Sequence, residues 1–134
     1  MRVITNILLS ILKPDPEEDD LRSLANGCDL LVIPTTPDAM AIDALLLTVD
    51  ALEKVGAKNY RILLTVVPPR PNRDGEEARE MLSGRELPLF KSEIKRLIAF
   101  QKASLAGVPV NEVSDPRAQI AWADYMAVGK EILK

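Results

Sequence analysis

The stretch that decides the fold reads CDLLVIPTTPD over residues 28–38 and is matched further along by YRILLTVVPPR over residues 60–70. Each contains a short continuous apolar run, which is typical of a β-strand covered on both faces. Between them, residues 39–55 repeat apolar side chains at the spacing of one helical stripe. A strand, a helix and a strand in this order predict a βαβ unit. The strands at 29–33 and 60–67 should therefore be parallel in one sheet, with the helix crossing between them.

The same alternation of strand and helix continues on both sides of this unit. An apolar run at 3–12 predicts a strand, and Asp15-Pro16-Glu17-Glu18 has the capping pattern that opens a helix, which Gly27 would end. The elements expected after Pro68 are a helix at 76–82, a brief strand at 87–90, a helix from Ser92 to Gly107, a short strand at 108–113 and a helix opened by Asp115-Pro116. The inward stripe of this last helix is expected to consist of Ala118, Ala121, Trp122, Tyr125, Val128 and Ile132. The sequence thus predicts one α/β domain over residues 1–134, with a mostly parallel sheet and flanking helices.

Composition excludes several classes of function. The 134 residues include no histidine and one cysteine, and 17 basic against 20 acidic residues give a net charge of −3. Without histidine, Ser-His-Asp and Cys-His hydrolases and His-based zinc sites are ruled out. The acidic balance disfavours a strongly basic nucleic-acid binder. The single cysteine fits a reducing compartment, and no apolar segment is long enough to span a membrane, so a cytoplasmic protein is expected.

The motifs that bind phosphate are not found in these residues. The phosphate loop needs a glycine, four residues and then Gly-Lys-Ser/Thr, which lets backbone N–H groups surround the phosphates. The one Gly-Lys pair, Gly129-Lys130, is followed by Glu131 and lies inside a predicted helix. No glycine-rich dinucleotide fingerprint follows any predicted strand either.

A group of basic residues allows two interpretations. Lys91, Lys95 and Lys102 are spaced by 4 and 7, which would place them on one face of the predicted helix, with Arg96 beside them. A solvated helix face is the ordinary interpretation of such a group. The alternative is a modest patch that contacts phosphates.

Four motifs in the same order resemble the carboxy-terminal half of the ParA/MinD-type (CobQ/CobB/MinD/ParA) partition ATPases. They are the segments 28–38 and 61–70, the LPLFKSEI segment at 87–94 and the GVPV segment at 107–110. The resemblance covers about residues 20–133. It implies a P-loop NTPase fold of the deviant-Walker type, ATP with magnesium as the ligand, and nucleotide-dependent dimers that segregate DNA or position cell machinery.

The resemblance also implies roles for individual residues. Thr65, Pro68, Gly107 and Pro109 would lie around the adenine of a bound nucleotide. The 34–38 loop would face the phosphate side and a dimer partner. Residues that would contact DNA nonspecifically are Lys91, Lys95, Arg96 and Lys102. A homodimer and a ParB-like partner protein complete the implied assembly.

The chain departs from the family at the catalytic motifs. The amino-terminal portion that carries the phosphate-loop lysines has no counterpart here, and the predicted 3–12 strand is followed by Lys13 where the family has an aspartate that organises magnesium. We therefore expect no catalytic residue, no metal ligand and no ATP hydrolysis by this chain alone. Two interpretations remain open: a partition ATPase module, or a non-catalytic protein that keeps the family's interaction surface. A flavodoxin-like or receiver-like domain fits less well, because a receiver needs acidic residues where Lys13 stands.

Overall fold

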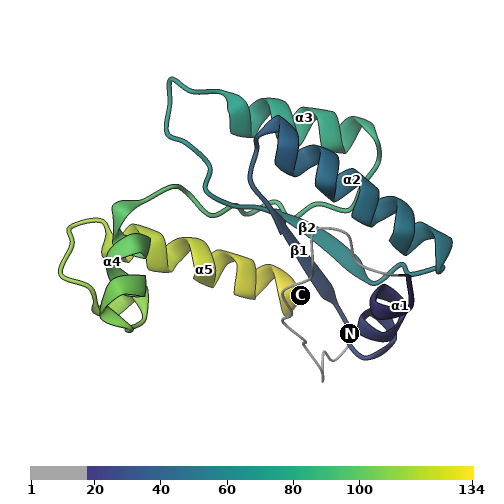
Figure 1. The fold of residues 1–134 in the computed structure, drawn as a ribbon. Coiled ribbons are helices and arrows are strands. Elements are labelled where there is room, and N and C mark those ends of the chain that lie inside the picture. The colour runs from purple at the N-terminus through teal and green to yellow at the C-terminus, as the bar shows by residue number, and fades with distance from the viewer. Residues whose placement is uncertain (1–17) are drawn as a thin grey trace.

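The computed structural model describes residues 18–134, so the predicted strand at 3–12 and the capping residues Asp15 and Pro16 lie outside the described residues. Helices surround a short parallel sheet (Figure 1). The elements are, in chain order, α1 (Glu18–Asn26), β1 (Leu31–Thr35), α2 (Ala39–Lys54), β2 (Tyr60–Leu64), α3 (Asp74–Gly84), α4 (Ile98–Ala106), a 3₁₀ turn at Val110–Glu112 and α5 (Ala118–Ile132).

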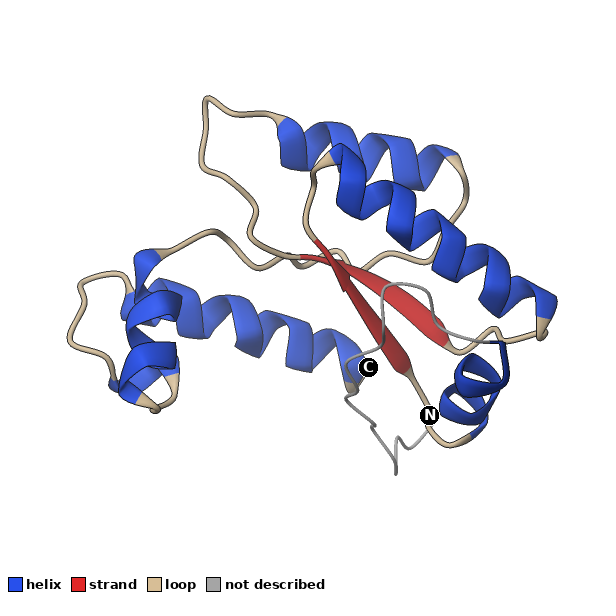
Figure 2. Ribbon diagram, viewed as in Figure 1, coloured by secondary structure: helices blue, strands red, loops and turns tan. Residues whose placement is uncertain are grey.

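The βαβ unit forms as predicted. β1 and β2 are parallel neighbours, with Leu31 opposite Tyr60 and Thr35 opposite Leu64, and α2 connects them (Figure 2). α2 begins where the Asp38 carboxylate accepts the Ala41 N–H, which satisfies a donor that has no partner in the first helical turn. The sequence therefore identified the order, type and parallel pairing of these three elements, although β1 lies two residues later than the predicted 29–33 strand.

An irregular third segment, residues 88–96, runs along the other edge of β2. The Ile62 N–H donates to the Pro88 carbonyl at 2.9 Å, and the Phe90 N–H donates to the Ile62 carbonyl at 2.8 Å. Further along, the Ile94 N–H donates to the Leu64 carbonyl at 3.0 Å. Leu89 forms an isolated parallel bridge with Ile62. The predicted 87–90 strand is thus reduced to a bridge, because Pro88 has no N–H to continue a ladder. β2 lies between β1 and this segment.

Two helical layers cover the sheet, and each has its own core (Figure 1). On one face, α1, α2 and α3 pack on the strands through a cluster that includes Leu21, Leu52, Ile62, Leu64 and Leu82, none of which is exposed. On the other face, Leu63 and Phe90 pack against Val128 of α5. A third, small cluster joins α4 to α5 through Ala99, Ala103, Val110 and Ala121. We call α4, the 107–113 loop and α5 the α4–α5 lobe.

Glycine is required where α3 meets Val67, just beyond the end of β2. A Cβ built on Gly75 would lie 2.6 Å from Cγ1 of Val67, closer than two carbon atoms can approach. The absent side chain lets the first turn of α3 lie directly on the buried Val67.

Three further predicted elements differ in position or type. The helix expected from Ser92 begins at Ile98, because residues 91–97 are held extended by hydrogen bonds to β2 and α5. The predicted 108–113 strand is a loop with a 3₁₀ turn. β2 ends at Leu64 rather than at residue 67, because Val66 has a positive φ of 53°.

The stripe predicted for α5 is partly wrong. Ala118, Ala121 and Val128 are buried as expected, but Trp122 and Tyr125 are 37% and 51% exposed. Asp124 is buried on this face instead. Within residues 18–134, none of the helices combines the length and the apolar character that crossing a membrane requires.

Candidate functional site

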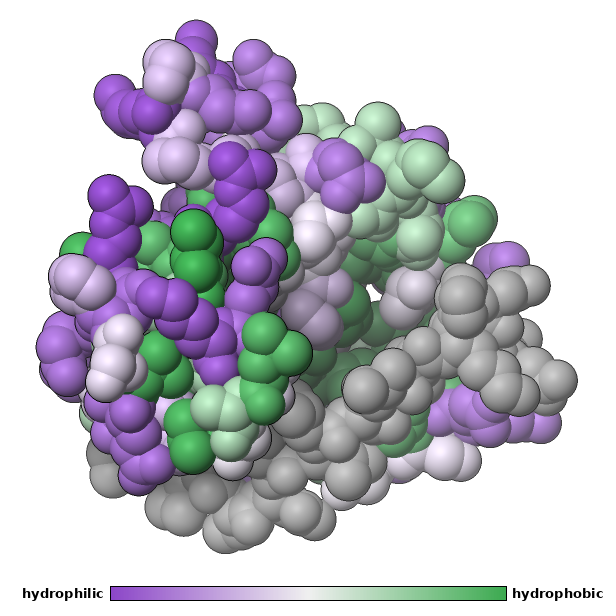
Figure 3. Space-filling model, turned by 60° about the vertical axis from the view of Figure 1, so that its left-hand side comes forward, coloured by the Kyte–Doolittle hydropathy of each residue, from purple (hydrophilic) through white to green (hydrophobic). Residues whose placement is uncertain are grey.

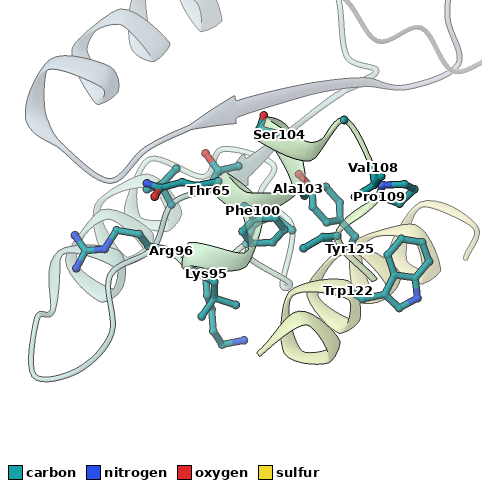
Figure 4. Close-up of a pocket in the computed structure, with 16 residues that line it drawn as sticks. Thr65, Lys95, Arg96, Phe100, Ala103, Ser104, Val108, Pro109, Trp122 and Tyr125 are labelled. Atoms are coloured by element: carbon teal, nitrogen blue, oxygen red, sulfur yellow. The ribbon is translucent and has the colours of Figure 1, made fainter. Parts of the chain in front are cut away.

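A cavity of about 820 Å³ lies between the end of β2 and the α4–α5 lobe (Figure 4). Its wall includes Thr65, Gly107 and Pro109, three of the four residues expected around an adenine. The fourth, Pro68, lies in the wall of a neighbouring cavity beside α3. The fold thus brings together residues that are far apart in the sequence.

The cavity occupies the edge of the sheet where α/β proteins bind ligands, beyond the carboxyl ends of parallel strands. Thr65 follows β2 directly, and its N–H donates to the Thr35 carbonyl at the end of β1 at 2.9 Å. The Thr65 hydroxyl also donates to that carbonyl, at 3.4 Å. These contacts fix the position of Thr65 in the cavity wall.

The lining is largely apolar and aromatic. Phe100 of α4 and Tyr125 of α5 meet edge to face, with ring centroids 5.5 Å apart and planes at 80°. Arg96 and Thr65 lie at one end of the cavity, and Trp122 and Pro109 lie at the other (Figure 4). This arrangement suits a flat aromatic ring that carries an anionic group.

The surface of the α4–α5 lobe carries several exposed apolar side chains. Ile98 and Leu105 of α4 and Met126 of α5 are among the large exposed apolar residues. Figure 3, which brings this side of the molecule forward, shows apolar groups interspersed among hydrophilic ones. The lobe therefore presents a mixed surface around the cavity.

Two carboxylates on α5 fasten the extended 91–97 segment. Asp124 accepts the Lys95 N–H at 2.8 Å and the Lys95 ammonium at 2.7 Å. Glu131 accepts the N–H groups of Lys91 at 3.0 Å and Ser92 at 2.6 Å. Burial by itself would raise the pKa of Glu131, but the bonds from Ser92 and Lys91 outweigh it and hold that pKa below its usual value.

Asp124 was not among the residues expected at the site, although the sequence contains a signal for it. Asp124 stands three positions after Ala121 and four before Val128, so it shares the buried face of α5 with both residues. An acidic residue in an apolar stripe indicates a buried partner, because an unpaired buried charge is costly.

The basic residues expected on one helix face do not share a helix. Lys91, Lys95 and Arg96 precede α4, and only Lys102 lies within it. The Lys102 ammonium pairs with Asp115 at 2.7 Å and its hydrogen bond holds the pKa of Asp115 below the usual value. Within the described part of the chain, no ion pair includes Lys91 or Arg96. Arg96 instead lines a groove with Arg117.

The 34–38 loop is engaged in local contacts. The Thr36 hydroxyl and the Ala41 N–H both donate to the Asp38 carboxylate and hold its pKa below the usual value. Among residues 18–134, no cluster of three or more acidic or cysteine side chains is placed to hold a metal ion. The polar groups of the 34–38 loop are thus partnered within the loop and the first turn of α2.

No known protein-family profile matches the chain. The chain is similar to the maintenance of carboxysome distribution protein A of Gloeobacter kilaueensis, with 29% identity over 134 residues that cover 98% of this chain and 62% of that protein. The chain thus spans less than two thirds of the length of this curated relative. The similarity gives loose support to a relationship with the ParA family.

Proposed function

We propose that this chain provides the adenine-binding side of a ParA-type ATPase that positions a cargo in the cell. The observation that carries the proposal is the cavity that joins Thr65 to Gly107 and Pro109 beside Phe100 and Tyr125. The similarity to a protein named for carboxysome distribution supports a positioning role. Within the same proposal, the alternative cargo is a chromosome or a plasmid, which the protein would partition.

Each part of the cavity has a role in this proposal. The apolar walls around Phe100 would exclude water from the base, and the Gly107–Pro109 backbone would border it. Arg96 would lie toward the anionic end of the nucleotide. Bound ATP would supply the phosphates and the magnesium, and the resulting dimer would form around the 34–38 loop. A non-catalytic interaction module is the second candidate, and the exposed apolar side chains of Ile98, Leu105 and Met126 favour it.

The chain is expected to bind adenine nucleotides without hydrolysing them. Burial of one base without a phosphate loop predicts a dissociation constant on the order of 0.1–1 mM for ADP. The measurement is a titration followed by NMR, together with a phosphate-release assay in magnesium and ATP. Phe100→Ala should weaken binding about tenfold, because it removes an aromatic wall.

Leu105→Ala is the matched control for Phe100→Ala. Leu105 lies on the same helix, is 90% exposed and is not part of the cavity wall, so its loss should leave affinity unchanged. Absence of any response to ADP at millimolar concentration would refute the adenine proposal. Magnesium-dependent phosphate release at an ordinary enzymatic rate would refute the expected lack of hydrolysis.

Nonspecific contact with DNA through Lys91, Lys95, Arg96 and Lys102 is a further part of the proposal, and Arg96 allows a direct test. Arg96 is in no ion pair within residues 18–134, whereas Lys102 is paired with Asp115. Arg96→Ala should weaken binding to duplex DNA and lower the slope of log affinity against log salt by about 1. Lys102→Ala should have a smaller effect. Fluorescence anisotropy over a salt series measures both, and equal effects would count against the assignment to Arg96.

A further inference from the structure

The side-chain alternation of β2 shifts by one residue beyond its end. Ile62 and Leu64 point to the face covered by α2 and α3, and neither is exposed. Strict alternation would send Val66 to the same face. Val67 occupies that face instead, in contact with the core around Ala78, while Val66 lines the 820 Å³ cavity and is 47% exposed.

The shift comes from a one-residue bulge at Val66. The Thr65 N–H still donates to Thr35 on one side, and the Val67 N–H donates to the Ile94 carbonyl on the other. Between these two bonds, Val66 adopts a left-handed backbone with a φ of 53°. Glycine usually fills this position in a bulge, because a β-branched residue is sterically strained there.

The core does not need the Val66 side chain, because Val67 fills the place beside Gly75. What Val66 contributes is an apolar branched group in the cavity wall next to Thr65. Backbone strain of this kind is found at functional sites, and bulges beside them redirect a side chain. The strained residue and the cavity thus coincide.

We propose that Val66 is a further ligand-binding residue, which the bulge directs into the cavity to pack against the flat face of a purine base. This inference rests on the proposed adenine-binding function. Its ligand class is the base with its sugar, so adenosine without phosphates is the appropriate probe.

Two substitutions separate the side chain from the backbone strain. Val66→Ala removes the two methyl groups and keeps a Cβ at the strained position, whereas Val66→Gly also removes the strain. Both variants of the full chain should bind adenosine about fivefold to tenfold more weakly, as measured by NMR titration. Val66→Gly should unfold about 4 °C above Val66→Ala, as measured by thermal denaturation.

Leu47→Ala is the matched control, since Leu47 is an exposed aliphatic residue of α2 outside the cavity, and it should leave adenosine affinity unchanged. If the unmodified chain binds adenosine and both Val66 variants bind it equally well, the role of Val66 is refuted and the proposed function stands. If the unmodified chain binds ADP but no adenosine, the role of Val66 is refuted and the proposed function stands, whereas if it binds neither ligand, both fail together. A Val66→Gly variant that is less stable than Val66→Ala would refute the strained bulge by itself.

Discussion

Phe90→Ala is expected to lower the free energy of unfolding by about 3–5 kcal/mol, which is a large part of the stability of a typical domain. Phe90 has no exposed surface, and its backbone is paired with Ile62 of β2. Its ring packs with Val128 of α5 and lies 4.8 Å from the guanidinium carbon of Arg61. Removing it opens a cavity where the sheet meets α5.

Urea denaturation followed by circular dichroism measures this loss. Met40→Ala serves as the control, because Met40 is exposed on α2 and its truncation should change stability by less than about 0.5 kcal/mol. Phe90→Leu should recover a large part of the loss, since it refills most of the volume. A Phe90→Ala variant within about 1 kcal/mol of the unmodified chain would show that α5 does not pack on this residue.

Asp124→Ala should lower stability by about 2–3 kcal/mol and weaken adenine binding as well. Most of the loss comes from the Lys95 N–H, which would be left without its charged acceptor. The ion pair itself adds less than about 1 kcal/mol, because the Lys95 side chain is half exposed. Binding weakens because the extended segment that forms one wall is released from the helix that carries Tyr125.

Asp124→Asn separates the contribution of the backbone hydrogen bond from that of the ion pair. Its amide oxygen can still accept the Lys95 N–H but carries no charge. It should recover more than half of the stability that alanine loses. Asp50→Ala is the control, because Asp50 is an exposed acid on α2. Equal losses for alanine and asparagine would place the stabilisation in the ion pair and contradict the backbone assignment.

The sequence predicted the βαβ unit well because its signals are local. The apolar runs and the helical stripe at 39–55 lie within single elements, and the capping Asp38 lies beside the helix it begins. Local signals did not bring Thr65, Gly107 and Pro109 together, and only the family resemblance implied that they surround one ligand. Their proximity in the fold depends on long-range packing of the α4–α5 lobe.

The misplaced start of α4 and the bulge at Val66 have tertiary causes. The apolar side chains between Lys91 and Leu97 have helical spacing, but N–H groups of this segment donate to the Glu131 carboxylate and to a carbonyl of β2. These hydrogen bonds hold the segment extended. Valine at position 66 favours a regular strand, so propensity predicts the opposite of the left-handed backbone that forms. Neither outcome can be predicted from the residues that are adjacent in the sequence.

The carboxylate attachment of α5 also determines how the molecule opens. The α4–α5 lobe is joined to the sheet by the Asp124 and Glu131 side chains and by the small core of Leu63, Phe90 and Val128, whereas β1 and β2 share a backbone ladder, so we expect the lobe to separate from the sheet before the two strands come apart. Sheet and lobe are then distinct units of local unfolding, with the cavity at the boundary between them. A ligand that contacts both units would suppress this opening, and its residence time would be tied to the lifetime of the closed lobe.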